Sequence, residues 1–443
     1  MTAQVLPMAL FLGIDIGTTG VRTAVIDAGQ SLVSTCRVSM AVPDLLDGRP
    51  VQDPAVWWSA TEACLETQMV ELSAAGRSPS EIEALAVDGT SGTLLLAGAG
   101  LEPVTPGLMY NSGGFDEESV AVVAAVPPGT DSASSIAAGP SSALARLLFA
   151  QNLPGAGRAE HVMFQADWIA SRLVGFGGVS DENNVLKLGY DLVCNRWPLD
   201  WFGGAGVRLE LLPEVRPVGD PLGTISEEAA RRFGLRRGVR VVAGTTDSNA
   251  AFIASGASRT GEGMTSLGTT LAIKLVSDRP VTSPTHGVYS HRLFGKWLAG
   301  GASNSGGGAL LTHFSRRELD SLSRRINPDQ DAGLDYYPLP RRGERFPVAD
   351  PDLKPRVSPR PESDATFLQG LFEGIARIER NGYRSLETLG GPKVVSVRTV
   401  GGGAGNACWR RIRKRIIGCD VVSVAAEAAE GSARIALISS RNG

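Results

Sequence analysis

A duplicated Gly-Thr-Thr hairpin pattern is the feature that most constrains how this chain can fold. The segment IGTTGVRTAVID, which begins at Ile16, recurs in outline as LGTTLAIKLVSD from Leu267. In each copy an apolar strand meets Gly-Thr-Thr, after which apolar and polar residues alternate as in a β-hairpin with one buried face. Internal similarity of this kind indicates repeated structural units. We therefore expect two similar domains, each opening with a hairpin whose tip faces a shared cleft.

The two hairpin tips have the chemistry of a phosphate-binding turn. Gly17 and Gly268 would let the backbone approach a ligand closely, because glycine has no Cβ. Hydroxyl and N–H donors suited to phosphate oxygens come from the threonines that follow, which are Thr18, Thr19, Thr269 and Thr270. The alternative is that both are only tight turns, but their occurrence in two corresponding positions weakens it.

Two further glycine-rich segments are candidate nucleotide contacts. One is GGASNSGGG at 300–308, which includes Gly307, and the other is VGGGAGN at 400–406, which precedes a helical pattern from Cys408 to Gly418. A strand that leads through glycines into a helix presents free N–H groups to an anion or a nucleotide. The chain has no GxxxxGK[ST] loop, and no GxGxxG opens a βαβ unit near its N-terminus. P-loop and dinucleotide-binding folds are therefore disfavoured.

Two carboxylates stand out because each follows a strand-like apolar run beside such a loop: Asp15 in GIDIGTT and Asp247 in VVAGTTDSNAAF. Asp15 lies in a run that should be buried, so a metal ion, water or hydrogen bonds must compensate it. A hard oxygen ligand beside a phosphate-binding turn suits Mg²⁺. Asp247 could be a proton acceptor or only a helix N-cap. In AVDGTSG, Asp88 could be catalytic or turn-forming, and Ser91 could bind a substrate hydroxyl or shape the turn.

Composition excludes several other classes of protein. A length of 443 residues favours two or three domains, and a net charge of −3 without a basic stripe disfavours nucleic-acid binding. The five cysteines contain no CxxC, which argues against disulfides and zinc and favours a reducing compartment. No signal or transit pattern and no run of about 18 apolar residues occurs, so we expect a soluble protein without a membrane partner. HExxH and a GxSxG elbow are also absent.

Taken together, these motifs resemble the FGGY carbohydrate kinases. GIDIGTTGVRTAVID is similar to the first phosphate hairpin of that family, TSLGTTLAI to the second, and VGGGAGNACWRRIRKRIIG to its adenosine segment. QDPAVWW, AVDGTSG, QADWIASRLVG, VVAGTTDSNAAF and FLQGLFEGIARIERNGY match over essentially the whole chain, in the expected order. Within the family, AVDGTSG and LKLGYD look most similar to the D-ribulose kinases of cyanobacteria and plants, formerly called putative xylulose kinases.

The resemblance implies a duplicated α/β fold of the actin-like, hexokinase-like (ribonuclease H-like) type, with two domains around a catalytic cleft. A sugar-binding domain would span residues 1–254, with the return of 425–443. A nucleotide-binding domain would span residues 255–424.

The resemblance also implies ATP-dependent phosphorylation of a sugar hydroxyl, with D-ribulose to D-ribulose 5-phosphate as the first reading. Asp247 would accept the proton and, with Asp15 and Ser91, contact the sugar, while Asp15 would also hold Mg²⁺ through water. The residues that would bind ATP are Gly17, Thr18, Thr19, Gly268, Thr269, Thr270, Gly307, Gly401, Gly402, Gly403, Ala404 and Asn406.

The chain departs from the family at one place in the sugar pocket. Many relatives have Trp-x-Asp-x-Arg or Tyr-Asn-Asp-Ala-Arg where this chain has YNSGG at 110–114. The missing acid and arginine remove two polar anchors for the sugar. Two alternatives therefore stay open: a xylulokinase or glycerol-type polyol kinase, and a nucleotide-binding ATPase or regulator without sugar turnover. We expect a monomer or homodimer in the cytoplasm, or in a plastid if a transit peptide has been removed.

Overall fold

The computed structural model describes residues 9–127 and 136–442, and the chain divides into two compact units. The first unit comprises the residues up to Ala254, Arg292–Phe294 and the residues from Ala426 onward. The second comprises Ser255–His291 and Gly295–Ala425. Each unit has its own hydrophobic core, so each is described by itself.

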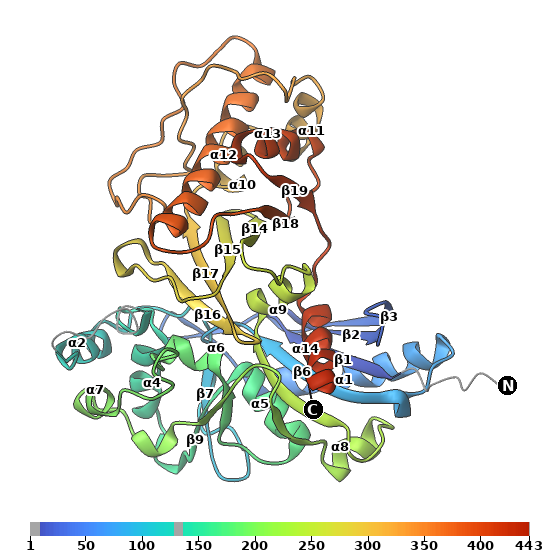
Figure 1. The fold of residues 1–443 in the computed structure, drawn as a ribbon. Helices are drawn as coiled ribbons and strands as arrows, with labels where there is room; N and C mark the ends of the chain where they lie inside the picture. The colour runs from blue at the N-terminus through green and yellow to red at the C-terminus, as the bar shows by residue number, and fades with distance from the viewer. Residues whose placement is uncertain (1–8, 128–135, 443) are drawn as a thin grey trace. The chain divides into compact units, whose positions relative to one another are not determined.

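The first unit is built on a six-stranded mixed sheet in the order β12-β13-β6-β1-β2-β3, of which β6, β1, β2 and β3 are labelled in Figure 1. The strands are β1 Leu10–Ile16, β2 Gly20–Asp27, β3 Leu32–Ser39, β6 Ile82–Gly89, β12 Pro221–Thr224 and β13 Arg240–Thr246. β1 is antiparallel to β2 but parallel to β6, which is also parallel to β13. β1 is buried along its whole length, as expected for a strand with both faces covered. The carboxyl ends of β1, β6 and β13 therefore meet at one edge.

Smaller sheets and helices complete the first unit. A five-stranded sheet contains β4 Asp44–Leu46, β5 Arg49–Gln52, β7 Leu94–Ala97, β8 Gly107–Leu108 and β9 His161–Phe164, and a two-stranded sheet contains β10 Val179–Asp181 and β11 Glu214–Arg216. The helices are α1 Pro54–Ala74, α2 Asp116–Ala124, α4 Ala143–Gln151, α5 Gln165–Val174, α6 Glu182–Val185, α7 Leu199–Gly204, α8 Glu227–Arg232, α9 Asp247–Ala254 and α14 Ala428–Asn442. α1 packs on β2 and β3, whereas α14 packs on β1, β6 and α9.

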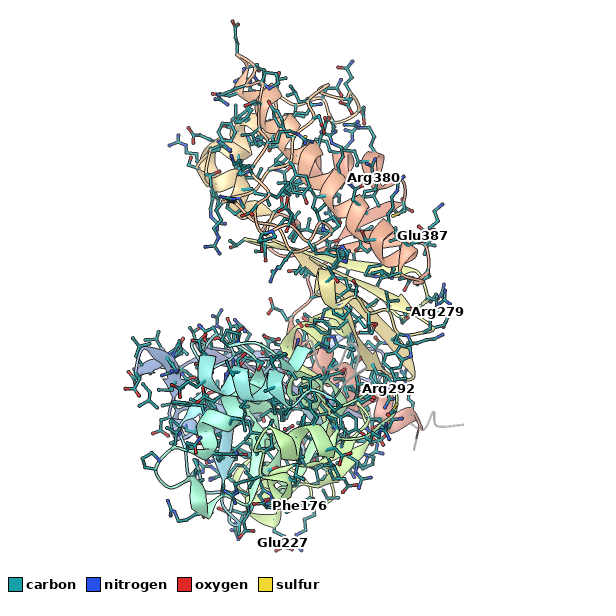
Figure 2. All side chains as sticks on the ribbon, turned by 90° about the vertical axis from the view of Figure 1, so that its left-hand side faces the viewer. Phe176, Glu227, Arg279, Arg292, Arg380 and Glu387 are labelled. Carbon is teal, nitrogen blue, oxygen red and sulfur yellow. The ribbon has the colours of Figure 1, made fainter. Side chains whose placement is uncertain are left out.

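The second unit contains a six-stranded sheet in the order β16-β17-β15-β14-β18-β19. Its strands are β14 Glu262–Leu267, β15 Leu271–Ser277, β16 Tyr289–Leu293, β17 Lys296–Ser303, β18 Ser396–Val400 and β19 Asp420–Ser423, where the last two residues of β16 are assigned to the first unit. Its helices are α10 Gly307–Leu311, α11 Arg316–Ser323, α12 Asp364–Thr388 and α13 Ala407–Ile417. Figure 2 labels Arg380 and Glu387 on α12, the long helix that packs against α11 and α13.

A buried ion pair ties the helices of the second unit to its sheet. Arg413 of α13 and Glu379 of α12 are 2.6 Å apart and almost fully buried. Thr265 of β14 donates to Glu379, and Arg413 donates to Thr399 of β18 at 2.7 Å. The network thus connects α12 and α13 to β14 and β18, the two strands that lead into the glycine-rich loops. Removal of either charged partner would leave the other charge buried and unpaired, which is strongly destabilising.

The predicted duplication is confirmed. In the first unit the order β13-β6-β1-β2-β3 repeats as β19-β18-β14-β15-β17 in the second, with the same parallel and antiparallel relations. Both Gly-Thr-Thr segments are the turns of antiparallel hairpins, β1–β2 and β14–β15. The predicted two-domain α/β fold class is thus also confirmed. In the described ranges, each helix is too short or too polar to cross a membrane.

Candidate active site

Two buried carboxyl groups lie side by side at the carboxyl ends of β1 and β6. Asp15 pairs in register with Asp88, and the two residues are 3% and 0% exposed. Residues paired in register on parallel strands point to the same face of the sheet. Thr245 of β13 continues the row, because it pairs with Asp88 on the other side.

The surroundings of this pair favour the protonated form of Asp88. Asp15 accepts from Arg22 Nη1 at 2.9 Å, and Asp88 Oδ2 accepts from Ser432 Oγ at 2.6 Å. Burial raises the pKa of Asp15, and Arg22 opposes the rise. Burial and then the charge of Asp15, with a smaller effect of Asp247, raise the pKa of Asp88 well above its usual range. Asp88 Oδ1 receives no hydrogen bond from the described residues, so in the protonated state it can donate to Asp15.

Arg22 changes the argument for a metal at Asp15. Arg22 and a hydrogen bond from Asp88 offset part of the cost of burying the Asp15 charge, although the pKa of Asp15 stays raised by burial. Within the described ranges, no three His, Cys, Asp or Glu side chains converge on a possible metal site. Mg²⁺ often needs only one or two carboxylates, because phosphate oxygens and water complete its coordination. Asp15 fits this smaller requirement, and its role as a metal ligand stays a prediction.

Asp247 is the first residue of α9 and directly follows β13. β13 contains a bulge, because its register with β6 shifts before Thr245. Gly244 permits the bulge, since a Cβ there would lie 1.8 Å from the carbonyl oxygen of Val87. Bulges beside active sites re-aim side chains, and this one sets where the strand delivers Asp247. Asp247 Oδ1 accepts from Ser248 N at 2.6 Å, a local bond compatible with both predicted roles, proton acceptor and helix cap.

A buried arginine joins the loop that carries Ser91 to the unusual segment at 110–114. Arg146 of α4 is 1% exposed, and burial lowers its pKa to about 10. Its guanidinium group donates to four backbone carbonyls, those of Gly92, Tyr110, Ser112 and Ser141. Arg146 of α4 therefore stabilises the backbone of segment 110–114, the segment that lacks the acid and arginine of many relatives.

The first hairpin tip is closed by backbone hydrogen bonds. Gly17 N donates to Gly20 O at 3.0 Å, and Met40 N donates to Thr19 O at 2.8 Å. Thr19 is exposed, and Gly17 and Thr18 are half-buried. The tip is thus ordered and accessible, as a phosphate-binding turn requires.

The second unit contains a cavity of about 620 Å³ between the β14–β15 turn, α10, α11 and the loop before α13. Of the residues predicted to bind ATP, the lining includes Gly268, Thr269, Gly307, Gly402, Gly403 and Asn406. Thr270, Gly401 and Ala404 are not part of the lining. Phe372 and Trp409 add an apolar wall and stack on each other with ring centroids 4.7 Å apart.

Glycines let the hairpin turn contact α10 through backbone alone. Gly307 N donates to Gly268 O at 2.8 Å, and Gly308 N donates to Thr269 O at 2.9 Å. A Cβ on Gly307 would lie 2.7 Å from Gly268 O, so a larger residue would separate the two elements. Asn406 has a structural role as well, because its Oδ1 accepts from Trp409 N at 2.9 Å and caps α13.

The cavity fits a nucleotide by size and chemistry. Ligand sites of this kind usually measure about 300–1,000 Å³ and combine apolar walls with a few polar groups. Here Phe372 and Trp409 offer apolar surface for a base, and the turn at Gly268 and Thr269 offers polar backbone and hydroxyl groups. Leu310 and Leu319 extend the apolar wall.

Sequence reasoning missed Arg22, Arg146, Phe372 and Trp409. The signal for Arg22 was present, because the predicted hairpin places it opposite Asp15, as the structure does. The contacts of Arg146 had no sequence signal, since they join loops far apart in the chain. The predicted sugar-contacting residues Asp15, Ser91 and Asp247 all belong to the first unit, and the ATP-contacting residues from Gly268 onward belong to the second.

Comparison with protein families gives two matches from one family. The N-terminal domain of the FGGY family of carbohydrate kinases matches residues 10–124, and the C-terminal domain of the same family matches residues 263–440. Together these matches cover more than half of the chain.

Individual relatives are distant, and their coverage of this chain ranges from about half to nearly all of it. A xylulose kinase of Lactococcus lactis is 23% identical over 440 residues, which cover 96% of this chain and 86% of that protein. A gluconokinase of Bacillus subtilis is 26% identical over 242 residues, 49% of this chain and 46% of that protein. The solved structure of a xylulose kinase from Rhodospirillum rubrum superposes with a TM-score of 0.83 at 22% identity, covering 98% of this chain and 90% of that one.

Proposed function

Because the chain belongs to the FGGY family of carbohydrate kinases, we propose that it transfers the γ-phosphoryl group of ATP to a hydroxyl of a neutral pentulose. The chain is a sugar phosphotransferase, and the family uses ATP with Mg²⁺. The finer identity of the acceptor rests on the charges at the carboxyl ends of β1, β6 and β13.

The observation that supports a neutral acceptor is that Arg22 and Arg146 already bind oxygen atoms of the protein. Arg22 pairs with Asp15, and Arg146 is surrounded by carbonyls. Asp247 adds negative charge close enough to raise the pKa of Asp88. A carboxylate substrate such as gluconate would meet this negative potential, and Arg22 and Arg146 already have partners within the protein. We therefore favour a ketose over an aldonate.

The residues of the first unit would act directly on the acceptor. Asp247 accepts the proton of the attacking hydroxyl, a contribution of about 10²- to 10⁴-fold in rate for a general base. Ser91 and Asp15 would contact the sugar, and Asp15 would also help to hold Mg²⁺, which would neutralise phosphate charge. Phosphoryl transfer otherwise asks the protein for alignment and charge neutralisation.

In this proposal the residues 1–254 with the returning segment 425–443 form the sugar domain, and residues 255–424 form the nucleotide domain. The cavity lined by Gly268 and Gly403 would hold ATP, which supplies the phosphoryl group. The hairpin threonines, Thr18, Thr19, Thr269 and Thr270, would hold the phosphates.

Two pentuloses compete as the acceptor. Relatives named xylulose kinases favour D-xylulose, whereas the AVDGTSG and LKLGYD motifs favour D-ribulose. The two sugars differ only in configuration at C3, so the hydroxyl there must be read by the pocket. The segment at 110–114, which has Ser112 where many relatives have an acid, is a candidate for recognising the configuration at C3.

A coupled ADP-release assay tests the proposal. D-xylulose, D-ribulose, glycerol and D-gluconate are compared at equal concentration with saturating Mg²⁺ and ATP. We expect kcat/KM to be highest for one of the pentuloses and at least about tenfold lower for gluconate, because a lost ionic or hydrogen-bonding match costs about that much. Preference for gluconate would contradict the neutral acceptor, and ADP release independent of every acceptor would favour the ATPase alternative. The cytoplasmic location and the state of assembly stay predictions.

A further inference from the structure

Three side-chain groups near the carboxyl ends of β6 and β13 are buried with no hydrogen-bond partner among the described residues. They are the hydroxyls of Ser91 and Thr246 and the amide nitrogen Nε2 of Gln165. Thr246 and Gln165 are both 0% exposed. An unmade bond of this kind is destabilising, so each unpartnered group needs an explanation. Ser91 is already a predicted sugar contact, but Thr246 and Gln165 are not.

Thr246 and Gln165 lie on the same face of the sheet. Thr246 of β13 pairs in register with Gly89 of β6. A Cβ on Gly89 would lie 3.2 Å from Gln165 Oε1, so the side-chain direction at this register position is toward Gln165. Residues paired in register on parallel strands share a face, which places the Thr246 side chain on the face of the sheet that Gln165 covers. Thr245 points to the opposite face, where its hydroxyl accepts from Asn183 Nδ2 at 3.0 Å.

The amide of Gln165 is fixed with its nitrogen turned away from β6. Its Oε1 accepts from Thr90 N at 3.1 Å and from Thr90 Oγ1 at 2.8 Å. A flipped amide would set Nε2 against the Thr90 N–H, a donor facing a donor. Nε2 is therefore held as a donor for which the described part of the chain supplies no partner.

We propose that Thr246 and Gln165 are sugar-binding residues that recognise hydroxyl groups of the acceptor next to the one that Asp247 deprotonates. This inference rests on the proposed function. A sugar hydroxyl both donates and accepts, so adjacent hydroxyls can satisfy a pure donor, Gln165 Nε2, and a threonine hydroxyl together. The ligand class is thus a polyhydroxylated compound with neighbouring hydroxyls, and a deoxy analogue should bind more weakly because it leaves one group unpaired.

Two threonine variants give opposite signatures and form the central test. Thr246→Val keeps the shape and removes an unpartnered hydroxyl, so we expect an unchanged or higher Tm and a pentulose Kd at least about tenfold weaker. Thr245→Val removes a hydroxyl of equal burial that is hydrogen-bonded within the protein. We expect that control to lower Tm and to change the pentulose Kd by less than about twofold.

Two glutamine variants provide the same comparison between an unpartnered group and a hydrogen-bonded control. Gln165→Glu retains an oxygen for Thr90 and loses the Nε2 donor, so sugar affinity should fall. Gln68 is a buried amide of the same unit that is bonded at both ends, to Thr23 Oγ1 at 2.8 Å and to Ser34 Oγ at 2.5 Å. Gln68→Glu should lower Tm without changing the affinity for the sugar.

Titration calorimetry with D-ribulose and D-xylulose, without nucleotide, separates this inference from turnover. Wild-type affinity in Thr246→Val and Gln165→Glu would overturn the inference even if the sugar is phosphorylated. A Tm loss in Thr246→Val with unchanged affinity would also overturn it, because the hydroxyl would then have a structural partner such as bound water. Absence of pentulose binding to the wild type overturns it as well. If the wild type binds a pentulose, the two variants lose that binding and no ADP forms, the inference stands and the proposed kinase activity fails.

Discussion

At the residue scale, the proposed chemistry depends on how three carboxyl groups divide their protons. Asp15 is paired with Arg22, and Asp88 is fully buried against Asp15 with a strongly raised pKa. Asp247 lies at the end of the bulged strand and at the start of α9. Because the pKa of Asp88 is raised more strongly than that of Asp15, we expect Asp88 to be the neutral member of the pair, and the proposal assigns the metal to Asp15 and the proton to Asp247.

Asp247→Asn should lower kcat by at least about two orders of magnitude while ATP affinity stays nearly unchanged, because it removes the proton acceptor and little else. Steady-state kinetics combined with nucleotide titration calorimetry measure both quantities. A variant that keeps most of its turnover but has a lower Tm would make Asp247 a helix cap instead.

Asp88→Asn should stabilise the protein at neutral and higher pH. Because the pKa of Asp88 is raised on folding, the folded state keeps a proton that the unfolded state loses above its ordinary pKa near 3.8. Wild-type stability should therefore fall as the pH rises from that value toward the pKa of the folded state. Asparagine keeps a neutral polar group for Ser432 and Asp15 and removes this loss, which is about 1.4 kcal/mol for each pH unit between the unfolded and the folded pKa. Melting curves from pH 4 to pH 8 without Mg²⁺ measure the effect: the variant should gain stability over wild type as pH rises, and equal slopes would contradict the buried proton.

Asp15→Ala should raise the Mg²⁺ concentration needed for half-maximal turnover, because it removes the carboxylate beside the first hairpin tip. Arg22 is about one-third exposed and can be solvated after the loss, so the Tm should fall little. Mg²⁺-dependent kinetics and a melting curve, measured on one preparation of the variant, distinguish a metal-binding role of Asp15 from a structural one. A large Tm loss with unchanged Mg²⁺ dependence would make Asp15 a purely structural partner of Arg22.

At the scale of the elements, the predictable part of the site is the local part. Each hairpin follows from alternation around Gly-Thr-Thr, and the Asp15–Arg22 pair follows from the hairpin register. The alignment of Asp88 with Asp15 requires the β1–β6 pairing, which joins strands with a helix between them and has no signal in either strand. The bulge at Gly244 and the reach of Arg146 are likewise products of tertiary packing.

Two neighbouring glycines in the loop before α13 should separate folding from nucleotide binding. Gly401 has φ of +90°, and a Cβ on it would lie 2.9 Å from Leu267 O, so Gly401→Ala should lower the Tm. A Cβ on Gly402 has no protein atom within 4 Å, although the residue lines the cavity. Gly402→Ala should therefore keep the wild-type Tm and raise KM for ATP. An unchanged KM in that variant, with a Tm loss in both, would contradict a nucleotide role for the loop.

At the scale of the whole molecule, the duplicated sheet was visible in the sequence because two hairpins of the same pattern occur far apart. Composition set the size class but could not choose an acceptor, since recognition of one sugar depends on a few hydroxyl contacts from separate loops. Thr246 and Gln165 illustrate this limit, because their adjacency follows only from the register of β13 and β6.

The most direct test of the central claim is the stoichiometry of one reaction. Purified protein, Mg²⁺, ATP and the preferred pentulose are incubated, and ADP and sugar phosphate are quantified together by mass spectrometry, with Asp247→Asn as the matched control. We expect one sugar phosphate for each ADP, little ADP without sugar, and at least about a hundredfold loss of both products in the variant. Equal ADP formation with and without sugar, and no sugar phosphate, would contradict the account.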